Sequence, residues 1–289
     1  MTRPRNRLQR RNVGKDGHYY LLDGEYVPGV TTALGIGLGL KFDIPSGWAA
    51  RICADWVIER RHLLADPTWT NTELHGMIRS APRNTTSDAA AKGKIIHAYG
   101  EQLTTTGEVE LADEHAHLAA HVEQYAMFLD RWQIETIASE VPLANTTLRY
   151  AGTADLIARS QPVVELYNQW LDSIGQPPIP PDAPGKLDIK SGNAIRDKDK
   201  CQIVAYSRAD LCHIDGVEQP TPTTYWHGLI HVRAEHAELH LIRPSYVDRL
   251  WDLFQHALAE WHALDEKRGW ISNATDNVDQ LLLAAQDAA

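Results

Sequence analysis

The chain has 289 residues, of which 43% are hydrophobic and 23% charged, and its formal net charge is −10 at pH 7. These proportions are those of an ordinary globular protein and exclude a fibrous or wholly disordered chain. The acidic balance argues against wholesale non-specific coating of nucleic acid. It does not argue against a metal enzyme, because carboxylates gathered around a cation add to the same negative total.

No apolar run approaches the roughly 18 residues that a membrane-spanning helix needs, and the first residues lack the apolar stretch of a secretory signal. We therefore expect a cytoplasmic protein with no membrane partner. The three cysteines, Cys53, Cys201 and Cys212, are too few and too scattered for a disulfide framework or a four-thiolate metal site. We expect them to be reduced.

Charge divides the chain near its start. Residues 1–15 are basic and contain no acid, and this segment is interpreted as a flexible arm that either follows phosphates or is a solvated tail. Residues 16–271 are predicted to form a single domain with its core at about 88–243. Residues 272–289 are predicted to be a weakly ordered tail.

Hydrophobic periodicity predicts the elements in chain order. The first is a hairpin over residues 18–34 that turns at Asp23-Gly24. Three helices follow, over 46–64 with Ser46 as N-cap, 87–103 and 112–132. The period then changes to that of strands, over 136–143, 146–152, 153–159 and 185–192, followed by a helix over 197–211, strands over 224–234 and 237–244, and a helix over 245–266.

This order predicts an α/β fold, with a central mixed sheet flanked by helices and helical additions at the N-terminal side. Residues 160–184 interrupt the pattern, because the prolines in QPPIPPDAPG preclude a continuous strand or helix there. We interpret this stretch as an insertion at a hairpin tip, either a neutral surface excursion or a lid over a substrate.

The chemistry is concentrated in two of the expected strands. In GKLDIKSG, Asp188 and Lys190 are two residues apart, so both project from one face while Leu187 and Ile189 enter the other. In GTADLIA, Asp155 is a single carboxylate in an apolar strand, which is costly unless the charge is paired or bound to a metal.

If these strands are neighbours, the two aspartates face each other and resist ionising together. A divalent cation such as Mg²⁺ or Mn²⁺ resolves the conflict, because carboxylate oxygens are the ligands that it prefers. The Lys190 ammonium can neutralise charge on a phosphate oxygen or help to activate water. Together these parts suit phosphodiester hydrolysis.

The order of these motifs is similar to that of a known family. His97 in KGKIIH, Asp155 in GTADLI, Asp188 and Lys190 in LDIK, and then QIVAY resemble the PD-(D/E)XK (restriction-endonuclease-like) nuclease superfamily, specifically its RecB-like, phage-type exonuclease branch. The resemblance spans roughly residues 93–206. Asp188 stands where many members have glutamate, and the three cysteines do not provide the four that an iron-sulphur branch requires, so no such cluster is expected.

The resemblance implies a role for each matching residue. His97, Asp155, Asp188 and the backbone carbonyl of Ile189 would bind one or two Mg²⁺ or Mn²⁺ ions, and Lys190 would be catalytic together with the two aspartates. Gln202 and Tyr206, on one helical face, would contact DNA or support the site. Glu140, in the strand before Asp155, would contact the metal or one of its ligands. Glu101, one turn beyond His97, is a further candidate for contact with a ligand.

The implied activity is that of a metal-dependent DNA exonuclease in recombination, end processing or phage DNA metabolism, in a bacterial or phage-infected cell. DNA ends are the implied partner, and a homo-oligomer or a recombination partner protein stays open. The alternatives are an endonuclease at branched or damaged sites and a DNA-binding scaffold without turnover. A zinc site of His227, His231 and His240 is not favoured, because no matching cysteine or carboxylate pattern accompanies it.

Overall fold

The computed structural model of the protein describes residues 6–13, 17–37 and 46–265. Its centre is a seven-stranded mixed sheet of strand order β10-β9-β6-β5-β4-β7-β8, in which only β6 and β9 pair in parallel. The strands are β4 (Glu135–Asn145), β5 (Tyr150–Arg159), β6 (Gly185–Lys190), β7 (Leu211–Ile214), β8 (Val217–Pro220), β9 (Trp226–Val232) and β10 (Ala237–Leu241).

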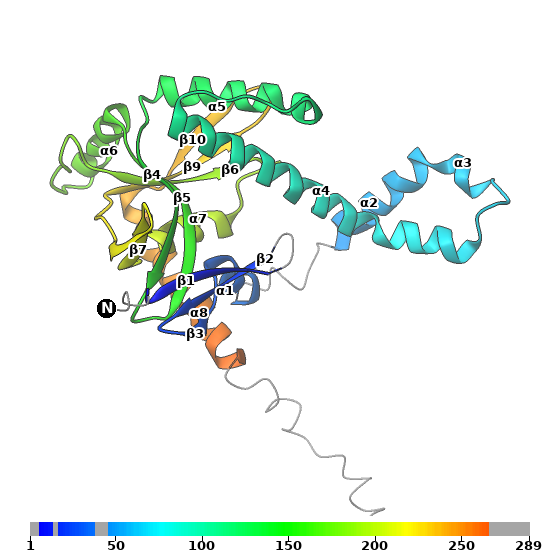
Figure 1. Ribbon diagram of the computed structural model, residues 1–289, viewed down its shortest axis with the longest axis horizontal. Helices are drawn as coiled ribbons and strands as arrows, with labels where there is room; N and C mark the ends of the chain where they lie inside the picture. Colours follow the sequence, from blue (N-terminus) through cyan, green and yellow to red (C-terminus); the bar gives the residue numbers. More distant parts are fainter. Residues whose placement is uncertain (1–5, 14–16, 38–45, 266–289) are drawn as a thin grey trace, which may run out of the picture.

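Helices cover both faces of this sheet (Figure 1). On one face, α1 (Val30–Gly37), α7 (Asp197–Ser207) and α8 (Val247–Asp265) bury a core that includes Tyr150, Val204 and Phe254. On the other, the end of α4 (Asn71–Thr106), α5 (Ala119–Arg131) and α6 (Gln161–Ser173) pack over a second core that includes Phe128 and Trp226. The predicted α/β class with a mixed sheet flanked by helices is confirmed.

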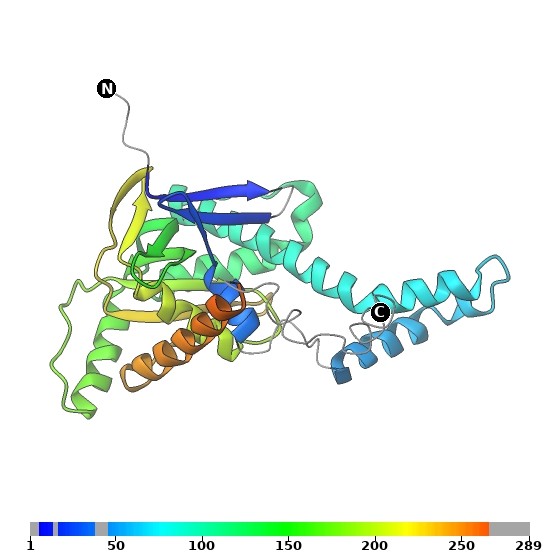
Figure 2. The ribbon, with the colours of Figure 1, turned by 90° about the horizontal axis from the view of Figure 1, so that it is seen from below.

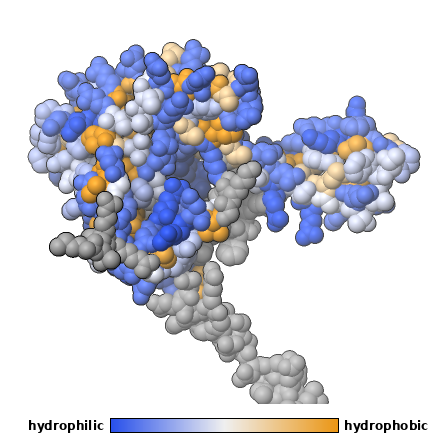
Figure 3. All heavy atoms as spheres, viewed as in Figure 1, coloured by the Kyte–Doolittle hydropathy of each residue, from blue (hydrophilic) through white to orange (hydrophobic). Residues whose placement is uncertain are grey.

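The helical additions at the N-terminal side project from this body. Helix α2 (Ser46–Glu59), the short α3 (Arg61–Leu64) and the first half of α4 form a hairpin that points away from the sheet in two perpendicular views (Figures 1 and 2). The surface of this projection is mostly hydrophilic (Figure 3). Among the described residues, no helix is both long and apolar enough to cross a membrane.

Helix α4 is much longer than the predicted helix over 87–103. It begins at a capping box, in which the Thr70 side chain accepts from the backbone of Glu73 and the Glu73 side chain accepts from Thr70, and it ends at Gly107 with a left-handed φ of 75°. Pro82 lies inside the helix. The sequence analysis missed residues 71–86 because polar residues and a proline conceal the helical period there.

The prediction of a flexible arm over 1–15 is wrong for its second half. Leu8–Val13 form strand β1, which pairs with β2 (Gly17–Leu22), and β2 pairs with β3 (Glu25–Val27) in a separate three-stranded sheet. Leu8 is fully buried and its backbone N–H donates to the Glu218 side chain at 2.9 Å. Burial of Leu8 and pairing with β2 order this segment, although its charge had suggested disorder. Residues 1–5 and 14–16 lie outside the described residues.

Residues 160–184 lie at the tip of a hairpin, as predicted, because β5 and β6 pair antiparallel on either side of them, but the alternative of a neutral surface excursion is wrong. Ser160 caps helix α6, and Val163, Val164 and Tyr167 of that helix are buried in the core. Only the proline-rich end of the segment has no regular structure, as its composition predicts. The predicted tail, 272–289, lies outside the described residues.

Two boundaries also differ. The expected strands over 146–152 and 153–159 are one strand, β5, that begins only at Tyr150. The expected helix over 197–211 ends at Ser207, and the chain then forms the β7–β8 hairpin, which the sequence analysis missed. A turn at Asp215 and Gly216, both with left-handed φ, joins these two strands.

Candidate active site

Helix α4 crosses the sheet closely because it carries glycine where it touches neighbours. Gly93, His97 and Gly100 share one helical face. A Cβ atom on Gly100 would lie 3.2 Å from the Tyr125 ring and 3.5 Å from Ile189 Cδ1, and one on Gly93 would lie 3.3 Å from Ser191 Oγ. The two glycines therefore let the backbone approach β6 and the loop after it, and His97 between them faces the sheet.

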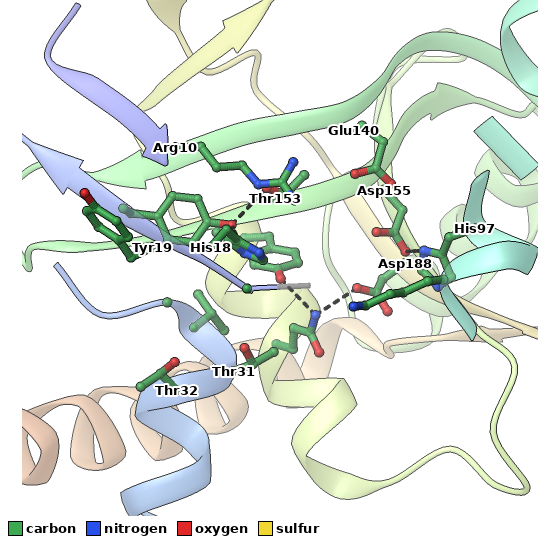
Figure 4. A pocket seen from close by; sticks show the side chains of 18 of the residues that line it. Arg10, His18, Tyr19, Thr31, Thr32, His97, Glu140, Thr153, Asp155 and Asp188 are labelled. Carbon is green, nitrogen blue, oxygen red and sulfur yellow. Dashed lines mark hydrogen bonds and ion pairs between the residues drawn. The ribbon is translucent and has the colours of Figure 1, made fainter. Parts of the chain in front are cut away.

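Three side chains from different elements meet at this crossing. His97, Glu140 of β4 and Asp155 of β5 each offer one ligand atom, and these atoms all lie within 4.8 Å of one another. His97 Nδ1 is 3.4 Å from Asp155 Oδ2. Figure 4 shows the three side chains together at one end of a pocket. One imidazole and two carboxylates are suitable ligands for a divalent cation.

Glu140 is held in an unusual backbone conformation. Its φ is +46°, in the left-handed region that a non-glycine residue adopts at a cost of about 1–3 kcal/mol. The pairs Ser139–Leu156 and Val141–Ala154 flank it, which places Glu140 opposite Asp155. Burial, and then the negative charge of Asp155, raise the pKa of Glu140 to about 7. Strain and desolvation at one carboxylate are typical of a functional position.

Asp155 is enclosed by groups that fix its carboxylate. Its Oδ2 accepts a hydrogen bond from the backbone N–H of Ile189 at 2.6 Å. Burial raises the pKa of Asp155 to about 6, and the charge of Asp188 raises it while that of His97 opposes the rise. A cation would stabilise the charged form of these partly buried carboxylates, whose pKa values are raised, so the residues fit a metal ion.

A second group of side chains lies beside the first. Lys190 Nζ is 2.6 Å from Asp188 Oδ2 and donates to Gln202 Oε1 at 3.2 Å. The Gln202 amide nitrogen donates to Asp188 Oδ1 at 3.0 Å and to the hydroxyl of Tyr206 at 2.8 Å. Strand β6 and helix α7 are thereby joined by a closed network in which the carboxylate, ammonium and amide hold one another.

The network keeps Lys190 charged. Burial alone would lower the pKa of Lys190, but the negative charges of Asp188 and Asp155 outweigh this effect, and the pKa is raised above its ordinary value. Asp188 is 1% exposed. Removing Lys190 would therefore leave a buried carboxylate without its cation.

Both groups open on one cavity of about 990 Å³. Its lining includes Asp155, Asp188 and Lys190 at one side and Arg10 and His18 of the N-terminal sheet at the other. In Figure 4, Arg10 and His18 lie between the N-terminal sheet and the acidic end, Tyr19 points away from that end, and Thr31 and Thr32 of α1 lie below them. The cavity thus has an acidic end and a wall of cationic and aromatic side chains.

The N-terminal wall is tied to the strand that carries Asp155. The Tyr20 hydroxyl is 2.9 Å from Thr153 Oγ1 and 3.1 Å from His18 Nε2. Gly29 forms a bridge with Ala151 at the base of the same strand. The sequence analysis missed this wall because it treated Arg10 as part of a flexible arm. Tyr20 and Leu22 are apolar at alternate positions, and this pattern indicates a strand with one buried face, which needs further strands beside it.

The predicted site residues are brought together, with three differences in detail. Asp188 is not one of the three clustered ligands, since Lys190 and Gln202 hold its carboxylate. Ile189 contributes its N–H to Asp155, and the metal-binding role of its carbonyl stays a prediction. Glu101 lines the cavity but is exposed.

Gln202 and Tyr206, predicted to contact DNA or to support the site, are 7% and 4% exposed. Gln202 donates to Asp188 and to the Tyr206 hydroxyl, so both residues are placed to support the site from within the protein. Tyr206 lies against Gly152, where a Cβ atom would be 2.4 Å from the tyrosine ring.

No protein-family model matches the chain, and no curated protein is significantly similar to it.

Proposed function

We propose that the protein is a metal-dependent deoxyribonuclease with a core of the PD-(D/E)XK type. The observation that carries the proposal is the meeting of two groups at one end of a cavity: the His97, Glu140 and Asp155 cluster, and the Asp188 and Lys190 pair. Cation ligands next to a fixed ammonium group are the parts that phosphodiester hydrolysis requires. The proposed family is based on the order of the sequence motifs that contain His97, Asp155, Asp188 and Lys190.

His97, Glu140 and Asp155 would hold Mg²⁺ or Mn²⁺. Asp188, on the strand next to that of Asp155, would add negative charge near the ion. When bound, the cation supplies positive charge that polarises a phosphate oxygen and lowers the pKa of an attacking water. The protein's own contribution is to fix the ligands. Helix α4 and the Ile189 N–H hold His97 and Asp155 in place, and the left-handed backbone of Glu140 directs a third donor to the same point.

Lys190 would stabilise the negative charge that develops on the phosphate in the transition state. Its ammonium is fixed by Asp188 and Gln202 before the substrate arrives, so little reorganisation accompanies the reaction. Arg10 on the opposite wall would meet a neighbouring phosphate, and the His18 ring offers a surface for base stacking. These features support a nucleic-acid substrate.

Exonuclease action at DNA ends in recombination, end processing or phage DNA metabolism is proposed from the family resemblance. The experiment that tests it incubates purified protein with end-labelled linear DNA and closed circular DNA, with Mg²⁺, with Mn²⁺ and with a chelator. We expect metal-dependent release of label from linear DNA only. Cleavage of the circle would identify an endonuclease, and metal-independent binding without cleavage in either metal would identify a scaffold.

A matched pair of variants tests the metal cluster itself. Glu140→Gln removes one clustered ligand, and we expect it to lower hydrolysis by about 10²-fold or more. Glu101→Gln is the control, because Glu101 lines the same cavity and is exposed outside the cluster. Equal activity of the two variants would contradict the assigned role of Glu140.

A further inference from the structure

A second group of potential ligands lies on the same face of the sheet, toward its β10 edge. His231 of β9 and Glu238 and His240 of β10 each offer one ligand atom, and these atoms lie within 4.8 Å of one another. His231 pairs with Glu238 on one side and with Lys190 on the other. Because paired residues of adjacent strands project to the same face, this group continues the row that begins at Asp155 and Asp188.

One ring nitrogen of His231 is fixed by the backbone. It is 7% exposed, and its Nε2 lies 2.7 Å from the carbonyl oxygen of Gly192. A carbonyl oxygen only accepts hydrogen bonds, so Nε2 carries the proton and Nδ1 keeps its lone pair. Metal-binding histidines commonly donate their other ring N–H to a backbone carbonyl, which fixes the ring and its tautomer.

We propose that His231, Glu238 and His240 form a second metal site, which binds a transition-metal cation such as Zn²⁺. Two imidazoles and one carboxylate are a known ligand set for zinc, with water in the fourth position. Imidazole favours Zn²⁺ and related ions, whereas carboxylate-rich sites suit Mg²⁺ and Mn²⁺. The two clusters therefore differ in metal preference, since the His97 cluster has one imidazole and this one has two.

The sequence analysis did not favour a zinc site here because it found no carboxylate to accompany the histidines. Glu238 comes from the adjacent strand, directly opposite His231 in the register. His227, which shares a strand face with His231, is not a member: it is buried beside Lys186, with which it pairs.

Glu238 contacts two exposed histidines. Its Oε2 is 3.3 Å from His240 Nε2, and its Oε1 is 3.5 Å from His236 Nε2. A plain surface ion-pair cluster would use the two exposed histidines equally. A metal site would need His240 and His231 as ligands, and metal binding would not change when His236 is removed. The effect of removing His236 therefore distinguishes the two interpretations.

The site would also hold the loop between β6 and α7. His231 binds the Gly192 carbonyl, and Arg233 Nη1 donates to the carbonyl of Asn193 at 2.9 Å. That loop joins the strand of Asp188 and Lys190 to the helix of Gln202. A cation on His231 would therefore restrain the connection between the elements that form the catalytic network.

The test is a titration of Zn²⁺ into the wild type, His240→Ala and His236→Ala, without DNA, with circular dichroism to verify that each variant is folded. We expect His240→Ala to bind one Zn²⁺ ion fewer than the wild type, or to bind it about 10²-fold more weakly. His236→Ala should match the wild type. Zn²⁺ should also raise the Tm of the wild type and His236→Ala more than that of His240→Ala.

Equal Zn²⁺ binding by the wild type and His240→Ala would overturn the proposal, and so would equal losses in His240→Ala and His236→Ala. Because no nucleic acid is present, neither outcome depends on the proposed nuclease activity.

Discussion

Strand β6 carries two lysines on one face, four residues apart, in opposite environments. Lys186 is fully buried, and its Nζ donates to the Tyr206 carbonyl at the end of α7 at 3.0 Å; burial lowers its pKa to about 8. Lys190 contacts the cavity and the carboxylate of Asp188, and its pKa is raised. The same residue type therefore caps a helix at the closed end of the strand and holds the candidate site at the open end.

The largest expected difference comes from replacing each lysine by methionine. Lys190→Met should lower kcat by about 10³-fold while DNA binding is largely kept, because Lys190 is proposed to act on the transition state and not on the bound substrate. The variant should also be less stable, since Asp188 loses its cation, so kinetics are compared in folded protein. Lys186→Met removes the same charge from the same strand face and should keep its activity. Steady-state hydrolysis and DNA binding of both variants check this. Similar losses of activity in both would show that Lys190 acts through folding alone.

Two glycines provide an intermediate effect. Gly152→Ala would place a Cβ atom 2.4 Å from the Tyr206 ring, and Gly185→Ala would place one 2.1 Å from the Trp226 ring. Each should destabilise the protein by about 1–3 kcal/mol through overpacking. Only Gly152→Ala should also displace Tyr206 from Gln202 and so lower kcat by about 10²-fold.

Urea unfolding and kinetics under fully folded conditions separate the two effects of these substitutions. Unchanged kinetics in folded Gly152→Ala would show that the Tyr206 hydroxyl does not support the site.

The smallest expected effect is a dependence of stability on pH, and it comes from His227, which pairs with Lys186 at the closed end of β6. Burial, and then the charge of Lys186, lower the pKa of His227 to about 3 from its ordinary 6.5. The unfolded chain thus takes up a proton first, and stability is lost as pH falls from 6.5 toward 3. At pH 5 the loss is about 2 kcal/mol, from 1.36 kcal/mol for each pH unit.

Urea unfolding of the wild type and of His227→Asn at pH 7 and pH 5 isolates this loss, because the raised pKa values of Glu140 and Asp155 add stability as pH falls and do so in both proteins. Relative to His227→Asn, the wild type should lose about 2 kcal/mol between pH 7 and pH 5. The same change in both proteins would contradict the role given to His227.

Sequence patterns predicted the part of the site that depends on local spacing. Asp188 and Lys190 share a face because a strand alternates, and Gln202 and Tyr206 share one because a helix repeats. The sequence analysis left the pairing of the strands of Asp155 and Asp188 as a condition, which the structure meets. The proximity of Asp155 to His97 was expected only from the family resemblance.

What sequence could not supply was contact between distant elements. Glu140 gains its place from a left-handed backbone angle within a strand, for which no residue type nearby gives a signal. Strand β1 was taken for a flexible arm because its charge is evident in the sequence and its partner strand is not. Helix α6 was hidden by the prolines that follow it, although its apolar spacing at Val163, Tyr167 and Leu171 is that of a buried helix.

The side-chain amide of Gln202 has one consequence for what can replace it. Its oxygen faces an ammonium group, while its nitrogen faces a carboxylate and a phenol. Glutamate has the same size and shape but only acceptor atoms when ionised, so it would set a second anion against Asp188. This position therefore needs a side chain that has a hydrogen-bond acceptor at one terminal atom and a donor at the other, and a side chain of the same shape without the donor does not fit.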